Sequence, residues 1–157
     1  GRTDADAIVI ACFSDPGISA VRAATDIPVI GIAEAAYLAA LGLGARFGIA
    51  SMGQSSILRH RRYLEALKID GRLAGDRSID MTVSELVATD AITPVTRIGA
   101  TLRDQDGAEV VILGCAGLGS YRAAVQAELG IPVIDPVQAG VALAATQAEL
   151  GYARRRA

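Results

Sequence analysis

Cys12 and Cys115 are the side chains whose type and position favour chemistry most clearly. Each comes at the end of a short apolar run, residues 8–11 in one case and 110–113 in the other, and turn-forming residues follow it. A thiolate can act as a base, and a thiol can return a proton. Two such groups on opposite faces of a carbon next to a carbonyl would remove its proton from one side and deliver one from the other, which inverts the configuration.

A single cysteine at the end of a buried strand is more often a small core residue than a reactive one. The case for chemistry depends on both cysteines occupying the same point of a repeated unit. A helix is expected shortly after each of them, and the positive end of a helix dipole favours a thiolate. We therefore treat the two cysteines as one candidate acid–base pair.

Residues 5–40 and 108–145 resemble two copies of one unit. Each copy contains an apolar run, a cysteine, turn formers and an Ala-rich stretch with helical spacing. Each then continues through the same Ile-Pro-Val-Ile segment, at 27–30 and at 131–134, into a second helical stretch. The spacing from the cysteine to this segment differs by a single residue between the copies, so chance is a poor explanation.

The predicted elements follow from this unit and from helix-capping signals. Asp15-Pro16 is predicted to cap and open the first helix, and Ser120 to cap its counterpart. The remaining predictions are a strand at 46–51, a helix at about 55–66, a capping box at Thr82 and Glu85, a helix opened by Thr93-Pro94 that ends near 106–107, and a last helix at about 137–150.

A strand, a helix and a parallel strand imply a right-handed crossover, so the predicted fold class is α/β. We expect two pseudo-symmetric lobes, each an open, mostly parallel sheet flanked by helices, with the site in the cleft between them. Residues 1–43 plus 136–157 are predicted to form the first lobe, and residues 44–135 the second. Comparison of the two copies predicts that the first lobe lacks its opening strand and helix, and hence that residues before Gly1 are missing through truncation, processing or disorder.

Composition narrows the classes of partner and compartment. The net charge is -2, and the basic residues are scattered apart from Arg59, Arg61, Arg62 and residues 154–156, which we expect on solvated faces or at a frayed end. This pattern gives no reason to expect a nucleic-acid partner. No apolar run reaches the roughly 20 residues that span a bilayer, so we expect no membrane partner, a cytoplasmic location and free thiols.

Other chemistries have weaker support in the sequence. His60 is the single histidine and is expected on a surface helix, which disfavours a Cys–His hydrolase pair. A metal site needs a denser set of ligands, and a thiol–disulfide protein would need a Cys-x-x-Cys pair. The Gly-rich turn at 114–119, with Asp135 beyond it, leaves a nucleotide-binding module as an alternative.

Three segments carry a resemblance to the aspartate/glutamate/hydantoin racemase superfamily, and most of all to its hydantoin and allantoin racemase branch. They are Ala11-Cys-Phe-Ser-Asp-Pro-Gly17, Pro28-Val-Ile-Gly-Ile-Ala-Glu-Ala35 and Leu113-Gly-Cys-Ala-Gly117. The resemblance implies an isomerase, a racemase that uses neither cofactor nor metal, with Cys12 and Cys115 as its catalytic pair. It also implies a small-molecule substrate and a homo-oligomer.

The neighbours of the cysteines depart from the amino-acid racemases of this superfamily, which usually carry Asn-Thr and Thr-His there. Phe13-Ser14 and Ala116-Gly117 stand in those places. This departure favours a less charged ring, a 5-monosubstituted hydantoin or allantoin, whose oxygens backbone N–H groups could hold.

The predicted substrate contacts are Phe13, Ser14, Ser51, Ala116, Gly117 and Glu34. Turn or cap hydrogen bonding is the alternative for the two serines, and a helix first-turn charge is the alternative for Glu34. The alternative functions are an aspartate or glutamate racemase, a maleate isomerase, an arylmalonate decarboxylase, and a non-catalytic module that binds small ligands.

Overall fold

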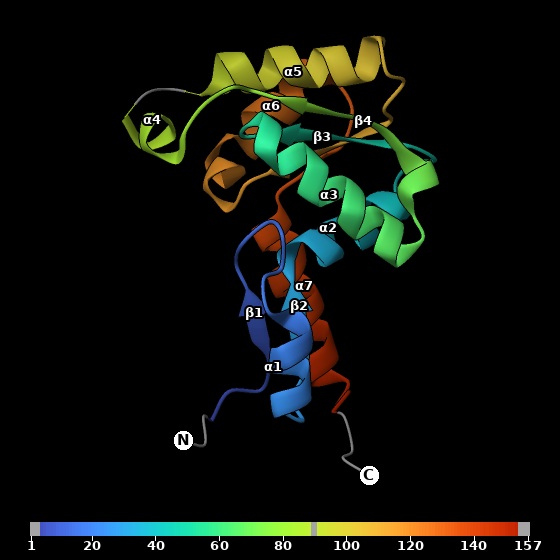
Figure 1. Cartoon of the computed structure of the whole chain (residues 1–157), viewed down its shortest axis with the longest axis vertical. Coiled ribbons are helices and arrows are strands. Elements are labelled where there is room, and N and C mark those ends of the chain that lie inside the picture. The colour runs from blue at the N-terminus through green and yellow to red at the C-terminus, as the bar shows by residue number, and fades with distance from the viewer. Residues whose placement is uncertain (1–3, 89–90, 154–157) are drawn as a thin grey trace.

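The computed structural model describes residues 4–88 and 91–153 and contains two parallel β-sheets flanked by helices (Figure 1). The smaller sheet pairs β1 (Ile8–Ile10) with β2 (Val29–Gly31). The larger sheet has the strand order β4-β3-β5-β6, with strands β3 (Phe47–Ser51), β4 (Leu73–Ser78), β5 (Val110–Gly114) and β6 (Val133–Ile134). Every pairing is parallel, which confirms the predicted fold class.

Helices connect the strands and cover the sheets. They are α1 (Ile18–Ala24), α2 (Ile32–Leu41), α3 (Gln54–Leu67), α4 (Val83–Ala88), α5 (Ile92–Asp104), α6 (Arg122–Leu129) and α7 (Pro136–Glu149). Two short 3-10 helices, η1 (Asp70–Arg72) and η2 (Ala116–Tyr121), precede β4 and α6. Both copies of the repeat therefore fold as strand, helix, strand and helix, as predicted, and the second copy adds η2 after its cysteine.

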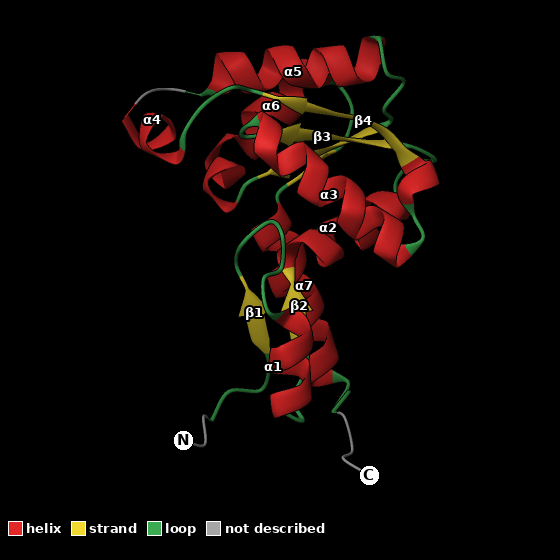
Figure 2. Ribbon diagram, in the orientation of Figure 1, coloured by secondary structure: helices red, strands yellow, loops and turns green. Residues whose placement is uncertain are grey.

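Helices cover both faces of the larger sheet (Figure 2), and its side chains alternate between two hydrophobic clusters, so the sheet is buried on both faces. The cluster on one face, here called the α2 cluster, comprises Phe13, Ile32, Ala33, Ala36, Tyr37, Ala40, Phe47, Ile49, Leu64, Val110, Ile112 and Ile134. The cluster on the other face, the α5 cluster, comprises Ala50, Ile79, Leu86, Ala91, Val95, Leu102, Ala108, Val111, Leu113, Leu118, Val125, Leu129 and Val133.

Helix α2 lies between the two sheets. Its Ala33, Ala36 and Tyr37 pack against the larger sheet in the α2 cluster. Its Ala35 packs with Ile30 of β2 and with α7 in a third, smaller cluster. Alanine side chains allow this close approach on both sides of the helix. The predicted division into two lobes stays a prediction, and α2 is the element across which those lobes would meet.

Three predicted helix starts are wrong. Helix α1 begins at Ile18, after Gly17, whose φ is 73°. Asp15 does not cap this helix, because its side chain accepts hydrogen bonds from the start of α2. Helix α6 begins at Arg122, after η2, without a side-chain cap from Ser120. Helix α5 begins at Ile92, so that Pro94 still lies in the first turn, where a backbone N–H needs no acceptor within the helix.

The capping box before α4 is confirmed. Glu85 accepts hydrogen bonds from the backbone N–H of Thr82 at 2.7 Å and from its hydroxyl at 2.8 Å, and the backbone N–H of Glu85 donates to that hydroxyl at 3.2 Å. Strand β4, Leu-Ala-Gly-Asp-Arg-Ser, was not predicted, because it lacks the β-branched residues that mark a strand.

Arg59, Arg61 and Arg62 are exposed on α3, as predicted, whereas residues 154–156 lie outside the described part of the chain. Among the helices that the structure describes, none has the length and apolar character needed to cross a bilayer.

The hydroxyl of Tyr37 generates a stability prediction. The side chain is fully buried, its ring stacks on Phe47 with centroids 5.8 Å apart, and its hydroxyl has no hydrogen-bond partner among the described residues. Because an unpaired buried hydroxyl costs free energy, we expect Tyr37→Phe to leave the free energy of unfolding unchanged or to raise it by about 1 kcal/mol. Urea unfolding measures this, and a loss above about 1 kcal/mol would contradict it.

Candidate active site

Cys12 lies on an exposed turn, two residues beyond the carboxyl end of β1. Its carbonyl oxygen accepts hydrogen bonds from the backbone N–H groups of Ser14 at 2.7 Å and Asp15 at 2.9 Å, which close the turn. Its Sγ is 3.6 Å from the Ser14 hydroxyl oxygen. Helix α1 begins only at Ile18, so the prediction that a helix starts just after Cys12 is wrong. The thiol is open to solvent with one hydroxyl beside it.

Phe13 anchors this turn to the protein interior. The ring is buried and belongs to the α2 cluster. It contacts Tyr37 and His60 edge-on, with centroid distances of 5.7 Å and 5.1 Å. An edge-to-face pair of aromatic rings contributes about 0.5–1.5 kcal/mol beyond the burial of its area. The residue next to Cys12 is therefore fixed against α2 and α3.

Asp15 fixes the other side of the turn, and it does so from the left-handed region of the backbone, at φ 46°. Its buried carboxyl group accepts hydrogen bonds from the backbone N–H groups of Ala33 at 3.0 Å and Glu34 at 2.9 Å. These two groups belong to the first turn of α2, where backbone donors lack partners within the helix. Gly31 leaves the space for this contact, because a Cβ there would lie 2.1 Å from the Asp15 Cγ.

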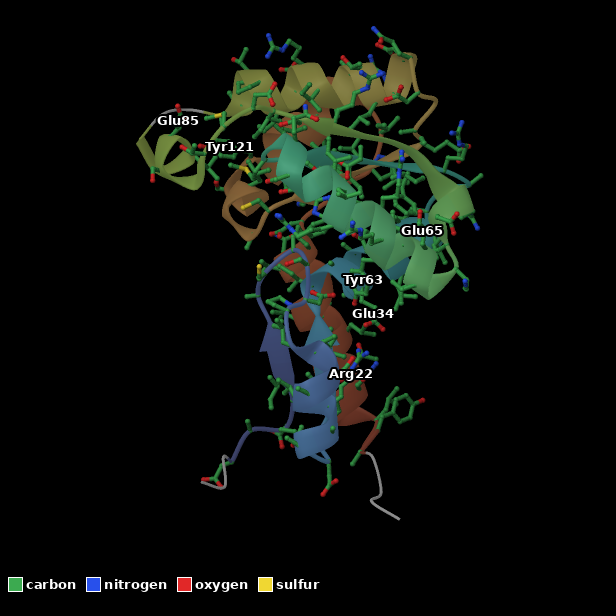
Figure 3. All side chains as sticks on the ribbon, in the orientation of Figure 1. Arg22, Glu34, Tyr63, Glu65, Glu85 and Tyr121 are labelled. Carbon is green, nitrogen blue, oxygen red and sulfur yellow. The ribbon has the colours of Figure 1, made fainter. Side chains whose placement is uncertain are left out.

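A chain of polar contacts runs from Asp15 along the first turn of α2. The Tyr63 hydroxyl, on α3, donates to Asp15 at 3.0 Å and lies 3.4 Å from a carboxylate oxygen of Glu34. Arg22, on α1, forms an ion pair with Glu34 at 3.0 Å and donates to the Val29 carbonyl at 3.1 Å. Figure 3 shows Tyr63, Glu34 and Arg22 following one another down the molecule. Glu34 therefore has partners from two helices.

Ser51, at the end of β3, belongs to a buried polar cluster. The imidazole Nδ1 of His60 is 2.9 Å from a carboxylate oxygen of Asp76 and 3.2 Å from the Ser51 hydroxyl. The Ser51 hydroxyl also donates to Asp76. The expectation that His60 lies on the surface is wrong: it is 2% exposed, because the exposed arginines around it occupy the other faces of α3. Serine and aspartate converge on one ring nitrogen, unlike a hydrolase triad, in which they bind opposite nitrogens.

Cys115 directly follows β5 and occupies the cap position of η2. It is half-buried and packs against the α5 cluster, and its carbonyl oxygen accepts a hydrogen bond from the backbone N–H of Leu118 at 3.1 Å. Gly117 is exposed, and a Cβ there would lie 3.8 Å from the Cys115 Sγ. Backbone donors at the start of η2 therefore lie within a few residues of this thiol.

The structure brings some of the predicted site residues together. Phe13 is a buried member of the α2 cluster, and Ala116 packs against the same cluster, so the residues that follow the two cysteines share one core. Ser14 and Gly117 lie beside the thiols in the two turns. Ser51 is fully buried with its hydroxyl bound to two partners, and the Glu34 carboxylate is engaged by Arg22 and Tyr63.

Sequence reasoning missed four residues that fix the Cys12 turn directly or through a partner: Asp15 as the cap of α2, His60, Tyr63, and Asp76, which binds His60. One signal was available, because residues 60 and 63 are spaced to share one face of a helix. Nothing in the spacing of Asp76 could have indicated its partner. Within the described residues, no group of three or more His, Cys, Asp or Glu side chains is placed to share a metal ion.

A cavity of about 270 Å³ lies away from both cysteines, between α1, α2 and α7. Its lining includes Arg22, Glu34, Leu38, Leu143, Gln147 and Tyr152. Of the predicted substrate contacts it contains Glu34 alone. The turns that carry the thiols are the stronger candidate for the predicted acid–base pair, because they hold Cys12 and Cys115 and the cavity lining contains neither.

Comparison with known proteins gives a consistent result. A family model described as Asp/Glu/Hydantoin racemase matches residues 1–144. A hydantoin racemase from Paenarthrobacter aurescens is 37% identical, over 97% of this chain and 65% of that protein. A hydantoin racemase from Pseudomonas sp. (strain NS671) is 36% identical, over 93% of this chain and 59% of that protein.

The solved structure of an allantoin racemase from Klebsiella pneumoniae superposes with a TM-score of 0.92 at 32% identity, over 97% of this chain and 63% of that one. The chain thus spans about three fifths of the length of the relatives that it matches.

The contacts of Asp15 generate a prediction about stability. Asp15→Ala leaves two backbone donors without their acceptor, removes the shorter of the two hydrogen bonds of the Tyr63 hydroxyl, and places alanine in the left-handed region. We expect the free energy of unfolding to fall by roughly 2–4 kcal/mol, measured by urea unfolding. Asp15→Asn keeps an acceptor and tolerates that backbone, so it should retain most of the stability. Asp135→Ala is the matched control: it removes a single cap bond, to Val137, and should cost about 1 kcal/mol. Equal losses at the two sites would contradict the assignment.

The pH dependence of this contribution has a definite sign. Burial raises the pKa of the Asp15 carboxyl above its ordinary value of 3.8, and hydrogen bonds from Ala33, Glu34 and Tyr63 offset part of the rise. The folded chain then holds the proton more tightly than the unfolded chain, so the associated stability is complete below pH 3.8 and is lost as pH rises through the folded-state pKa. The stability difference between wild type and Asp15→Ala should shrink over this range in urea titrations, and a difference that grows would refute the sign.

Proposed function

Because this chain belongs to the Asp/Glu/hydantoin racemase family, we propose that it acts as a cofactor-independent racemase. The proposed reaction inverts a carbon next to a carbonyl in a 5-monosubstituted hydantoin or in allantoin. One observation supports this most directly: Phe13 and Ala116, which follow the two thiols, pack in the same hydrophobic cluster. The relatives named hydantoin racemase and allantoin racemase support the choice of substrate class.

In the proposed reaction, the thiolate of one cysteine removes the proton from the ring carbon. The C–H bond breaks, an S–H bond forms, and the electron pair moves onto the neighbouring carbonyl oxygen as an enolate. The thiol of the other cysteine then gives its proton to the opposite face of the carbon, and the carbonyl re-forms. Cys12 and Cys115 exchange the roles of base and acid when the other enantiomer reacts.

The substrate contacts proposed are those that chain continuity places beside the thiols. Ser14 offers a hydroxyl near Cys12, and the backbone at Gly117 is exposed near Cys115, so either could hold a ring oxygen. Ala116 supplies apolar contact in place of a group that would bind a carboxylate, and Phe13, whose ring is buried, holds the Cys12 turn in place. For Ser51 and Glu34 we propose a supporting role, because partners within the protein already engage their oxygens. A cytoplasmic location and a homo-oligomer stay predictions.

The test uses each enantiomer of a 5-monosubstituted hydantoin in deuterated water. We expect the wild-type chain to abolish optical rotation and to place deuterium on the inverted product. Cys12→Ser and Cys115→Ser should each slow inversion by about 10²–10⁴-fold, the typical contribution of a positioned acid or base. Optical rotation and the proton NMR signal of the ring carbon follow the two processes.

A variant that adds a thiol at another position provides the control. Ser120→Cys adds a thiol at an exposed position of η2 and should leave the rate of inversion unchanged, which would show that the position of a thiol matters rather than the number of thiols. Full activity in both cysteine-to-serine variants would exclude the proposed pair. Inactive wild-type chain with every hydantoin and with allantoin would exclude the proposed substrate class.

A further inference from the structure

Helix α3 contacts the Cys12 turn at two points. His60 and Tyr63 are three residues apart, so both project from one face of the helix. The ring of His60 lies edge-on to Phe13, one residue after Cys12, with centroids 5.1 Å apart. The hydroxyl of Tyr63 donates to Asp15, three residues after Cys12, at 3.0 Å. The turn that carries the exposed thiol is thus attached to α3 on both sides of Ser14.

The same helix is anchored to the larger sheet. His60 is bound by Ser51 of β3 and Asp76 of β4, and Leu64 is fully buried in the α2 cluster. Ser51 is paired in register with Gly114 of β5, the residue immediately before Cys115. A short series of buried contacts therefore joins α3 to the strand that ends at the second thiol.

These contacts connect the two turns through one rigid element. The connection runs from Cys12 through Phe13 and His60 to Ser51, and from there across the sheet to the strand before Cys115. We propose that α3 is a strut, in which His60 and Tyr63 act as positioning residues that set where the Cys12 thiol lies relative to the Cys115 thiol. This proposal rests on the proposed racemase function, because the separation matters only if both thiols serve one carbon.

If α3 is a strut, a change in its contacts should alter the fraction of ring carbanions that are protonated with retention rather than with inversion. When Cys115 takes the proton, the ring carbanion must receive its new proton from Cys12 for inversion to occur. If Cys12 is displaced, Cys115 can exchange its proton with solvent and return a deuteron to the same face. The C–H bond is then replaced by a C–D bond with the configuration retained. Reaction of the mirror-image substrate begins at Cys12 itself, so displacement slows its exchange and its inversion together.

The variants are Tyr63→Phe, His60→Gln and the double variant, assayed with each hydantoin enantiomer in deuterated water. The measured quantity is the ratio of deuterium exchange with retention to inversion. This ratio does not depend on how much of the protein is folded, so loss of stability does not change it. We expect it to rise about ten-fold or more in the double variant for one enantiomer and to stay constant for the other, since small displacements of a reacting group cost up to about 100-fold in rate.

Two control variants test whether the effect depends on the positions of His60 and Tyr63 rather than on the type of substitution. Tyr152→Phe makes the same chemical change at an exposed tyrosine, and Arg61→Gln changes an exposed residue of α3; both should leave the ratio unchanged. A slower reaction with an unchanged ratio for both enantiomers would show that His60 and Tyr63 serve stability alone, and would overturn the proposal.

A second measurement distinguishes failure of the strut from failure of the proposed function. Rigid bis-maleimides of increasing length cross-link the Cys12 and Cys115 thiols without any catalysis. We expect wild-type chain to react best with one length and the double variant to lose that preference. If the wild-type chain shows neither exchange nor inversion, the racemase function fails and the cross-linking still tests the strut. An identical length preference in wild type and double variant would overturn it.

Discussion

The position of Cys12 depends on the carboxyl group of Asp15, which is buried against the first turn of α2. Two backbone N–H groups and one tyrosine hydroxyl donate to this group, and it thereby ties together three elements that are distant in sequence: the turn after β1, α2 and α3. The contact requires a residue that tolerates the left-handed backbone at position 15 and the absence of a Cβ at position 31. The exposed thiol lies on a turn that is fixed at the residue after it by an aromatic ring and two residues later by a carboxyl group.

Both copies of the repeat bring a carboxyl group and a glycine together at the start of the second helix, but the two residues have exchanged places in the chain. In the first copy, the turn after the cysteine supplies the aspartate, and the end of the second strand supplies Gly31. In the second copy, Asp135 follows the second strand and caps α7, and Gly119 in η2 leaves the space beside it: a Cβ at Gly119 would lie 2.6 Å from a carboxylate oxygen of Asp135. Each copy thus places one carboxyl group at the start of its second helix with a glycine opposite it. The start of the second helix requires both the carboxyl group and the glycine. The first copy takes the carboxyl group from the turn after the cysteine, whereas the second copy takes it from the residue after the second strand.

The buried polar cluster of Ser51, His60 and Asp76 gives the cysteine turn a second fixed point, where His60 contacts Phe13. Buried polar groups are stable only when their hydrogen bonds are formed, so each member restricts the others to one arrangement. Because Phe13 packs edge-on to this imidazole, the apolar core and the polar cluster meet at the residue that follows Cys12. The exposed arginines of α3 concealed this role in the sequence, since a histidine between them has the pattern of a solvated face.

The sequence by itself determined the repeat, the parallel α/β fold, the capping box at Thr82 and the equivalent placement of the two cysteines after parallel strands. These features arise from local patterns: apolar runs, turn formers and helix spacing. The expectation that both strands are buried holds for β5 alone, because β1 is only partly buried. The tertiary structure alone decided that Asp15 caps α2 rather than α1, that His60 is buried, and that β4 joins the sheet as its edge strand. The physical reason is the same in each case. A carboxyl group, an imidazole or a weakly β-forming segment takes its role from partners that lie far along the chain, and local spacing contains no information about those partners.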